Sequence, residues 1–358
     1  TIGLGRQNSV ETIRITWPNG LIQNETQQEF DRRLAIEEKP RLSGSCPMIF
    51  TWNGKQFEYI SEVLGVAPLG ASLGNGQFFP VDHDEYVLLN ANQLVERDGF
   101  FDVRVTEELR EVAYIDQVRL IAIDSPAGVD VITNEKFKAP PFPKFQLFGV
   151  AESDKVRPVQ AVDQLGRDVL STVLHRDGQY VDGFRRTFSN TAELHSLTVD
   201  MAGLKGDRST TLFLTGWVDW SSASTIVAGS QTSSSGVQPP VIQVRDAKGD
   251  WTTVDSDPGL PGGNPRTMAV DLTGRFLSDS REIRILTNMC VYWDEVYAVD
   301  GIHTLQADRH EAPLDSAELR FRGFSQNVVH PQRLEPEKFI YSQVRSTTAW
   351  DPTTGLYT

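Results

Sequence analysis

The sequence predicts a mainly β fold of antiparallel β-sandwiches with little helix. Three observations support this prediction: apolar runs of strand length recur along the whole chain, turn-forming residues bound most of them, and helical periodicity is scarce. Many short strands joined by turns are typical of sandwiches, and galactose-binding-like jelly rolls are the version of this architecture that we consider first.

The expected strands either alternate apolar and polar residues or are apolar throughout, as half-buried and fully buried strands do. The turn at 17–20 makes the first of them one arm of a hairpin, with Pro18 at its end because proline cannot donate to the ladder. The one helical candidate, 162–174, contains Gly166, which weakens it. In chain order the expected strands are 11–17, 48–52, 85–89, 100–106, 115–123, 194–201, 210–220, 240–246, 281–287 and 291–299.

The chain is long enough for two or three modules, at 358 residues. Two stretches have the composition of linkers or long loops. The first, 136–146, is rich in proline, and the second, 221–240, is rich in serine and glycine. We expect irregular backbone in both.

The charge balance excludes some classes of partner. The formal net charge is −14 and the isoelectric point is about 4.9, whereas nucleic acids and anionic lipids favour clustered Lys and Arg. No apolar run approaches the roughly 20 residues that span a bilayer. We therefore expect no nucleic-acid partner and no membrane span, and an acidic chain that is compatible with cation binding.

The two cysteines, Cys46 and Cys290, allow at most one disulfide. They form no C-x-x-C pair of the kind used for zinc or redox chemistry. We expect buried free thiols.

Two segments share a pattern that suggests an internal repeat. Residues 103–118 and 283–296 each contain an apolar-Arg-apolar strand, a short link and then a tyrosine two residues before an aspartate, Asp116 and Asp294. A repeat of this kind predicts two related β-sandwich units. Chance similarity between hairpins is the alternative.

The acidic pair Asp294 and Glu295 lies inside the apolar run 291–299, which makes it a candidate for catalysis. Side chains alternate along a strand, so the two carboxylates are expected to point to opposite faces and not to converge on one substrate atom. The favoured interpretation is structural. Asp294 would be half of a cross-strand ion pair, with arginines such as Arg284 nearby, or a cap for loop amides.

Three acids in PVDHDEY, Asp82, Asp84 and Glu85, are the candidate metal ligands. Alternating carboxylates on a loop can supply two or three oxygens to a hard cation, and calcium is the cofactor such a loop would hold. The favoured alternative is a solvated acidic turn. Asp255 and Asp257 allow the same two interpretations.

Ser72 is the candidate nucleophile of a hydrolase, because GASLG (70–74) fits the G-x-S-x-G pattern. That motif requires a strand before the serine and a helix after it. Gly74 and Gly76 disfavour a helix, so a glycine-rich surface loop is the better interpretation.

Trp217, Asp219 and Trp220 are the candidate ligand-binding residues. They lie where an expected strand meets the serine-rich stretch. Indole rings stack on sugar rings while short polar groups bind hydroxyls, which is typical of glycan-binding sandwiches. The alternative is that the tryptophans, Trp217 first among them, fill the core.

The first segment carries a specific motif. Residues 3–38 open with Gly3-Leu4-Gly5, continue with Ile13-Arg14-Ile15 and reach the turn Trp17-Pro18-Asn19-Gly20. This combination resembles the ASPIC/UnbV domain. In that family the domain usually follows FG-GAP repeats that form a β-propeller, in secreted or cell-surface proteins similar to cartilage acidic protein 1. Further segments look like the C-terminal extension of bacterial members: 46–70, 215–220, 288–296 and 317–325.

The resemblance implies an exported protein that is secreted, periplasmic or at the cell surface. We expect 1–42 to be the C-terminal part of the ASPIC/UnbV domain, and 43–147 and 148–305 to be two β-sandwich units, the second jelly-roll-like. The remaining segment, 306–358, is expected to be extended, and its part 334–358 is expected to pack across the surface through Phe339, Tyr341 and Trp350.

The function expected from these observations is a non-enzymatic binding or adhesion module for a glycan or an extracellular protein. A hydrolase of esterase or glycosidase type, and a spacer that docks an upstream β-propeller of the same polypeptide, are the alternatives.

Overall fold

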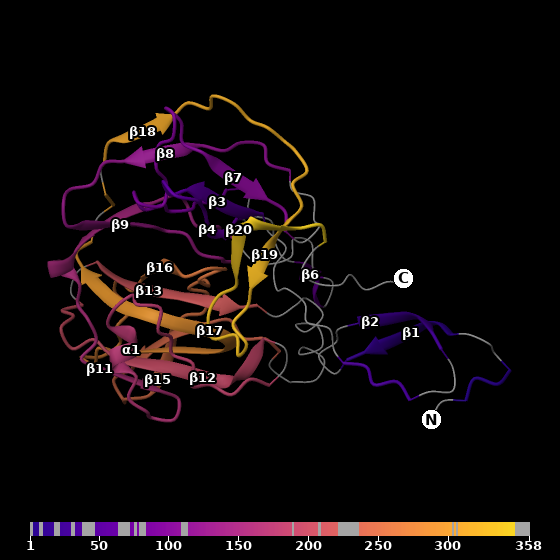
Figure 1. Cartoon of the computed structure of the whole chain (residues 1–358). Helices are drawn as coiled ribbons and strands as arrows, with labels where there is room; N and C mark the ends of the chain where they lie inside the picture. Colours follow the sequence, from indigo (N-terminus) through magenta and orange to yellow (C-terminus); the bar gives the residue numbers. More distant parts are fainter. Residues whose placement is uncertain are drawn as a thin grey trace.

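A computed structural model of the chain (Figure 1) describes residues 3–6, 10–17, 22–29, 33–37, 47–63, 72–74, 77–78, 84–108, 114–187, 190–206, 209–220, 236–302, 304–305 and 307–347. Their strands form seven sheets in which every pairing is antiparallel. Helix in this part of the chain is limited to α1 (Leu170–Val173) and the short 3-10 turn η1 (Glu152–Asp154). The prediction of a mainly β, antiparallel fold is confirmed.

The largest sheet is organised around one long strand, β17 (Glu282–Asp300). Its first half pairs with β12 on one edge and β14 on the other, and its second half pairs with β13. The other strands of this sheet are β11 (Gln160–Asp163), β12 (Thr191–Asp200), β13 (Thr210–Asp219), β14 (Val241–Arg245), β15 (Trp251–Asp255) and β16 (Arg266–Asp271).

Because β17 changes partners along its length, it belongs to both layers of a sandwich. The five-stranded layer consists of β11, β12, the first half of β17, β14 and β15. The three-stranded layer consists of β16, β13 and the second half of β17. Strands that pass from one layer to the other in this way make the corners of sandwiches. Two strands are predicted here, 281–287 and 291–299, but the chain continues through Asn288-Met289-Cys290 as one strand.

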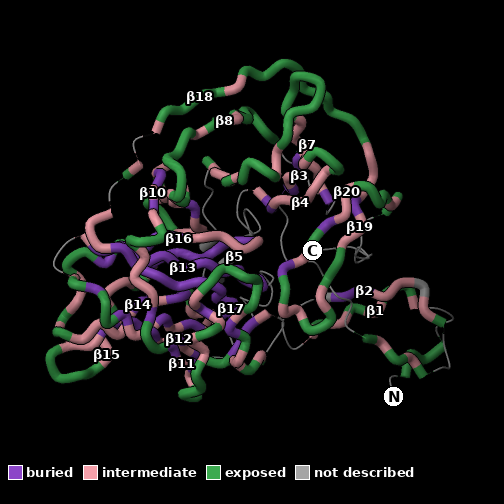
Figure 2. Tube along the Cα trace, turned by 60° about the vertical axis from the view of Figure 1, so that its left-hand side comes forward, coloured by how far each residue is buried: buried purple, intermediate pink, exposed green. Residues whose placement is uncertain are grey.

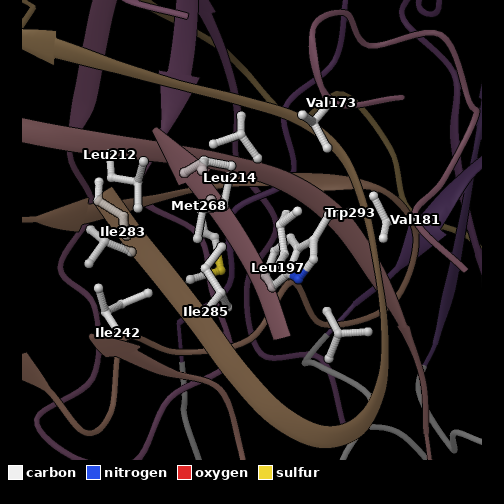
Figure 3. Packing of buried hydrophobic residues seen from close by; sticks show 14 of the residues in the cluster. Val173, Val181, Leu197, Leu212, Leu214, Ile242, Met268, Ile283, Ile285 and Trp293 are labelled. Carbon is white, nitrogen blue, oxygen red and sulfur yellow. The ribbon is translucent and has the colours of Figure 1, made fainter. Parts of the chain in front are cut away.

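The main hydrophobic core lies between these two layers (Figure 3). Apolar side chains that alternate along each strand provide it, and the buried part of the tube in Figure 2 is concentrated in β13, β17 and β12. Members from both layers include Leu197, Leu212, Leu214, Ile242, Met268, Ile283, Ile285 and Trp293.

The outward side of the three-stranded layer is covered. The hairpin of β9 (Val129–Thr133) and β10 (Leu147–Ala151) packs on it through a second apolar cluster. In that cluster Phe148 meets Phe213 of β13, and Phe213 stacks on Tyr297 of β17. The three-stranded layer is therefore buried on both sides.

A smaller sheet, of β3 (Met48–Trp52), β4 (Phe57–Glu62) and β7 (Val103–Thr106), packs against the C-terminal hairpin of β19 (Phe324–Val328) and β20 (Lys338–Arg345). Phe50 contacts Tyr341 with ring centroids 5.1 Å apart, and Tyr59 contacts Phe339 at 5.3 Å. Phe339 and Tyr341 thus make the packing contacts expected of them, and Trp350 lies outside the described residues.

Three further two-stranded sheets complete the described part. They are β1 (Val10–Thr16) with β2 (Ile22–Gln28), β5 (Ser72–Gly74) with β6 (Gln77–Phe78), and β8 (Leu120–Ile123) with β18 (Arg309–Ala312). The β1–β2 hairpin stands apart from the rest of the molecule in Figures 1 and 2. No helix in the described residues is both long and apolar enough to cross a membrane.

Several expected elements differ in the structure. Residues 85–89 and 115–119 form no strand, and the helical candidate 162–174 gives β11 and the single turn α1. Between those two elements the Asp163 carboxylate accepts hydrogen bonds from the backbone N–H groups of Leu165 and Arg167. Gly166 has a φ of +74°, which breaks the helical pattern.

The two copies of the suspected repeat also differ. Residues 114–119 are exposed and irregular, whereas the matching residues 292–297 lie in the buried strand β17. Tyr114 is 88% exposed and Tyr292 only 1%. Asp116 and Asp294 therefore have different surroundings, although the apolar-Arg-apolar parts of both segments, 103–105 and 283–285, are strands.

Candidate functional site

Asp294 lies at a β-bulge of β17, and its carboxylate caps a loop. The register against β13 shifts between Thr215 and Gly216, so that Asp294 is the extra residue of β17. Its side chain accepts hydrogen bonds from the backbone N–H groups of Asp177 (3.1 Å) and Gly178 (3.3 Å). Burial raises the pKa of Asp294, while these two bonds act in the opposite direction. Of the two structural roles considered for Asp294, this is the loop cap.

The Glu295 carboxylate has different partners from the Asp294 carboxylate. Its carboxylate lies 3.4 Å from the Arg157 guanidinium and 4.0 Å from the Lys155 ammonium. Burial raises the pKa of Glu295, and the two cations oppose that shift. The Lys155 ammonium also lies 4.8 Å from the centroid of the Tyr297 ring. The two acids at the centre of this strand thus make separate structural contacts.

Strict alternation, which placed Trp293 and Glu295 on the same face, is wrong here. Trp293 packs in the core between the two layers, together with Val296 and Ala298. Tyr297 packs in the cluster on the outward side. The bulge adds one residue to β17 and so reverses which positions face inward.

Trp217 and Trp220 are in the interior, each 3% exposed. Trp217 stacks on Tyr292 with ring centroids 4.5 Å apart, and Trp220 meets Phe137 edge to face at 5.2 Å. A sugar cannot stack on a ring that is covered in this way, so these indoles provide no open platform for a glycan. The arrangement is the core-filling alternative that the sequence left open.

Asp219 is the centre of a buried ion network that fixes the segment after β19. Its carboxylate accepts two hydrogen bonds from Arg333 Nε and Nη2, at 3.0 and 2.7 Å to the nearer oxygens, and lies 3.3 Å from Arg186 Nη1. Both arginines have a raised pKa because hydrogen bonds and the nearby charge stabilise their protonated forms. Arg186 also donates hydrogen bonds to the Tyr292 hydroxyl and the Arg333 carbonyl. Asp219 is therefore saturated by protein partners.

The structure describes two of the three acids predicted as metal ligands, and the prediction for the set is not tested by it. Glu85 lies 3.8 Å from Arg266, Asp84 is exposed, and Asp82 is outside the described residues. Asp255 and Asp257 pair with Arg275 and Lys138. Among the residues that the structure describes, no group of three or more His, Cys, Asp or Glu is placed to hold a metal ion.

The backbone at Ser72 differs from a nucleophile elbow. Ser72 begins β5, which pairs with β6 only a few residues later, so the local structure is a hairpin. An elbow needs a strand that turns directly into a helix. Among the cysteines, Cys290 is a buried free thiol whose pKa is raised to about 12 by desolvation, and Cys46 lies outside the described residues.

The outward side of the five-stranded layer is accessible to solvent and carries polar side chains in rows. Along the first half of β17 the buried residues Ile283 and Ile285 alternate with the half-buried Glu282 and Arg284. One row across the strands consists of Thr198, Arg284, Gln243 and Thr253. The neighbouring row consists of Asp200, Glu282, Arg245 and Trp251. We call these two rows the polar face.

Two guanidinium groups meet one aromatic ring on the polar face. The guanidinium carbons of Arg245 and Arg284 lie 3.8 and 4.5 Å from the centroid of the Trp251 ring. Arg245 also pairs with Glu282 at 3.0 Å. Arg284 donates its Nε–H to the Gln243 amide oxygen at 2.7 Å, and it has no carboxylate partner among the described residues. Desolvation and the charge of Arg245 lower the pKa of Arg284.

No binding role for this face is predicted from the sequence. The alternation in 240–246 and 281–287 is enough to place Gln243, Arg245 and Arg284 on the outward side of their strands. It does not reveal that the two strands are neighbours, because about forty residues separate Gln243 from Arg284. Their meeting depends on the register of β14 against β17.

Comparison with known proteins gives one match. Residues 1–42 match the family described as ASPIC and UnbV, which agrees with the resemblance drawn from the Gly-Leu-Gly and Trp-Pro-Asn-Gly motifs. No curated protein and no solved structure matches the chain. The family match covers 42 of the 358 residues, namely the β1–β2 hairpin and its flanks, and does not extend to the sandwich or the polar face.

Proposed function

We propose that this chain is a non-enzymatic binding module that works outside the cytoplasm and engages its ligand with the polar face. The single observation behind this proposal is how the charged groups are distributed. The carboxylates in the interior of the sandwich are bonded to protein partners, whereas Arg284 on the polar face has no carboxylate partner in the described part of the chain.

The arrangement of the interior acids supports binding over hydrolysis. Glycoside hydrolysis needs two carboxylates on either side of an open cleft, roughly 5–9 Å apart. Asp294 caps a loop, Glu295 pairs with Arg157, and Asp219 is held between two arginines. Each carboxylate thus has a structural partner that a reacting group would have to displace.

The extracellular location and the choice of a glycan or protein ligand rest on the ASPIC/UnbV resemblance of the first 42 residues and on the acidic composition. A net charge of −14 disfavours nucleic acid as a ligand. A polar sheet surface in an exported sandwich is suited to ligands that are themselves hydrated.

The test combines binding screens with hydrolase panels. The chain is screened against a glycan array and extracellular matrix proteins, and against broad esterase and glycosidase substrates. We expect ligand capture without product release. Thr253→Trp, which places a large side chain at an exposed position of the polar face, should abolish capture, whereas Leu319→Trp at a fully exposed site elsewhere should not.

Two outcomes would contradict the proposal. Product release that is lost in a folded Ser72→Ala, Asp116→Asn or Asp294→Asn variant would identify a hydrolase. Absence of any ligand, with Thr253→Trp indistinguishable from the wild type, would favour a spacer that docks an upstream β-propeller.

A further inference from the structure

The polar face holds a cation whose hydrogen-bonding capacity is largely unused. A guanidinium carries five N–H donors. Arg284 donates its Nε–H to Gln243, and the described residues provide no acceptor for its terminal N–H groups. Arginines in folded proteins usually engage a carboxylate or a carbonyl when they are partly buried. The two terminal amino groups of Arg284, which form a planar fork, are thus held in place and available to bind a ligand.

The surroundings of Arg284 favour an anion in that fork. Arg245 lies against the same tryptophan ring but is paired with Glu282 at 3.0 Å, so Arg284 carries the positive charge here that no carboxylate of the described residues balances. The Trp251 ring and the Gln243 amide hold the planar group in place, so little side-chain freedom remains to be lost on binding. A planar fork matches the two oxygens of a carboxylate.

The position of Arg284 within the sheet disfavours an extended peptide. Peptides that join a sheet need an unpaired edge for main-chain hydrogen bonds. Around Arg284, β17 is paired with β12 on one side and with β14 on the other, so only side chains are available. The side chains beside Arg284 are Thr198, Gln243 and Thr253. The Gln243 amide donates one N–H to the Thr253 hydroxyl at 3.0 Å, which leaves its second N–H and the two threonine hydroxyls for a hydroxylated ligand.

The acids of the neighbouring row limit the charge density of the ligand. Glu282 stands beside Arg284 on β17, and Asp200 stands opposite Glu282 on β12. A chain with several sulfate groups per sugar would bring negative charge against these two carboxylates. A chain with one carboxylate per repeat can place it at Arg284 and keep its hydroxyl groups toward the acids.

We propose that the polar face binds a uronate-containing polysaccharide without sulfate groups, with the sugar carboxylate held by the Arg284 guanidinium and the hydroxyl groups held by Gln243, Thr198 and Thr253. This assignment deepens the proposed function and rests on it, because it names the ligand class of the same face.

The test measures binding of oligosaccharides by calorimetry and affinity electrophoresis. The probes are a uronate polymer (alginate or hyaluronan oligosaccharides), neutral dextran, heparin and poly-glutamate. We expect the uronate probe to bind best and its affinity to fall steadily between about 50 mM and about 500 mM NaCl. Arg284→Ala should weaken it about tenfold or more, as the loss of a charge-assisted fork predicts. The affinity of Arg284→Lys should lie between those of the wild type and Arg284→Ala. Arg320→Ala, which removes an exposed arginine elsewhere, should leave the affinity unchanged.

A second variant keeps the proposal testable if Arg284→Ala does not fold. Gln243→Glu places a carboxylate beside the Arg284 guanidinium, which neutralises the fork without removing it. This variant should fold as well as the wild type and still lose uronate binding. Unchanged binding in folded Arg284→Ala or Gln243→Glu would overturn the assignment.

The other outcomes separate this inference from the proposed function. Equal binding of dextran, or stronger binding of heparin, would overturn the uronate assignment, and poly-glutamate bound as tightly as the uronate probe would identify an acidic peptide as the ligand. If a different ligand binds and Thr253→Trp abolishes that binding, the proposed function stands and the uronate assignment fails. If no probe and no screened ligand binds, both fail.

Discussion

Asp294 illustrates how a carboxylate is kept inside an apolar strand. The bulge in β17 directs it toward the exposed loop at 177–178, where it accepts hydrogen bonds from two backbone N–H groups. Asp294 is itself buried, and a buried carboxylate is costly unless it has such partners. The bonds therefore account for an acid at this position without any role in catalysis.

We predict that Asp294→Ala destabilises the protein by about 1–3 kcal/mol, because the loop at 177–178 loses its two hydrogen bonds to a charged acceptor. Asp294→Asn retains an acceptor oxygen and should lower the free energy of unfolding less than Asp294→Ala does. Denaturant unfolding monitored by tryptophan fluorescence measures both. Asp182→Ala, an exposed aspartate of the same loop, is the control and should change little. A stable Asp294→Ala variant that had lost a binding or catalytic activity would contradict the structural role.

At the scale of elements, the bulge depends on a glycine in the neighbouring strand. Gly216 of β13 stands opposite Trp293, and a Cβ added there would lie 2.4 Å from the Tyr292 carbonyl oxygen and 2.9 Å from a ring carbon of Trp293. The backbones of β13 and β17 are hydrogen-bonded to each other here and cannot move away from an added Cβ. The close approach of β13 and β17 thus requires the absence of a side chain.

Gly216→Ala should therefore destabilise the sandwich by about 1–3 kcal/mol through overpacking, although alanine is otherwise better suited than glycine to regular structure. Thermal unfolding would show this as a lowered Tm. Gly3→Ala, at a position with nothing within 4 Å of the added Cβ, is the comparison and should leave Tm unchanged. Equal Tm values for wild type and Gly216→Ala would mean that the two strands are farther apart than described.

The C-terminal hairpin offers a second test at this scale. Phe339 is buried against Tyr59 of the small sheet, whereas Phe321, in the segment before β19, is 85% exposed. Phe339→Ala should lower the free energy of unfolding by about 3–5 kcal/mol, and Phe321→Ala should lower it by less than about 0.5 kcal/mol. Limited proteolysis should release the hairpin from the Phe339→Ala variant first. Similar losses in both variants would contradict the described docking of β20 on β4.

At the scale of the whole molecule, the small sheet, the C-terminal hairpin and the sandwich meet around Glu337. Asn327 of β19 donates a hydrogen bond to its carboxylate at 2.8 Å. The pKa of Glu337 is raised to about 7, mainly by desolvation. The hydrogen bond from Asn327 and the charge of Arg333 oppose this rise, whereas the charges of Glu62 on β4 and Asp219 on β13 add to it. The protonation of Glu337 is thus coupled to groups in all three parts of the fold.

This pKa predicts a stability that falls as the pH rises. The folded state binds the proton of Glu337 more tightly than the unfolded state, whose glutamate titrates near 4.5. The contribution is fully present below about pH 4.5 and is lost as the pH passes about 7. Unfolding free energies measured between pH 5 and pH 8 should decline less in Glu337→Gln than in the wild type. Glu335→Gln, exposed and paired with Lys338, should decline as the wild type does. Parallel profiles for wild type and Glu337→Gln would refute the assignment.

Much of the secondary structure follows from local pattern. The runs 48–52, 210–220 and 281–287 are strands because their apolar residues suit a buried or half-buried strand, and Gly166 ends the helical pattern at 162–174 because it adopts a positive φ. Residues 85–89 and 115–119 have a similar local pattern but form no strand in the described chain. A strand needs a neighbour to bond to, and local pattern cannot supply one.

By itself, the sequence determined the mainly β, antiparallel class and the ASPIC/UnbV motif of the first segment, because each depends on residues close together in the chain. The cap that Asp294 forms on the loop at 177–178 joins residues far apart in the chain and needed the tertiary structure. Only the tertiary structure decided that Trp217 and Trp220 are buried, that β17 serves two layers, and that Arg284 meets Gln243 and Trp251 on one face. These features depend on strand register and on which faces are covered. Both are set by packing between segments that are distant in sequence.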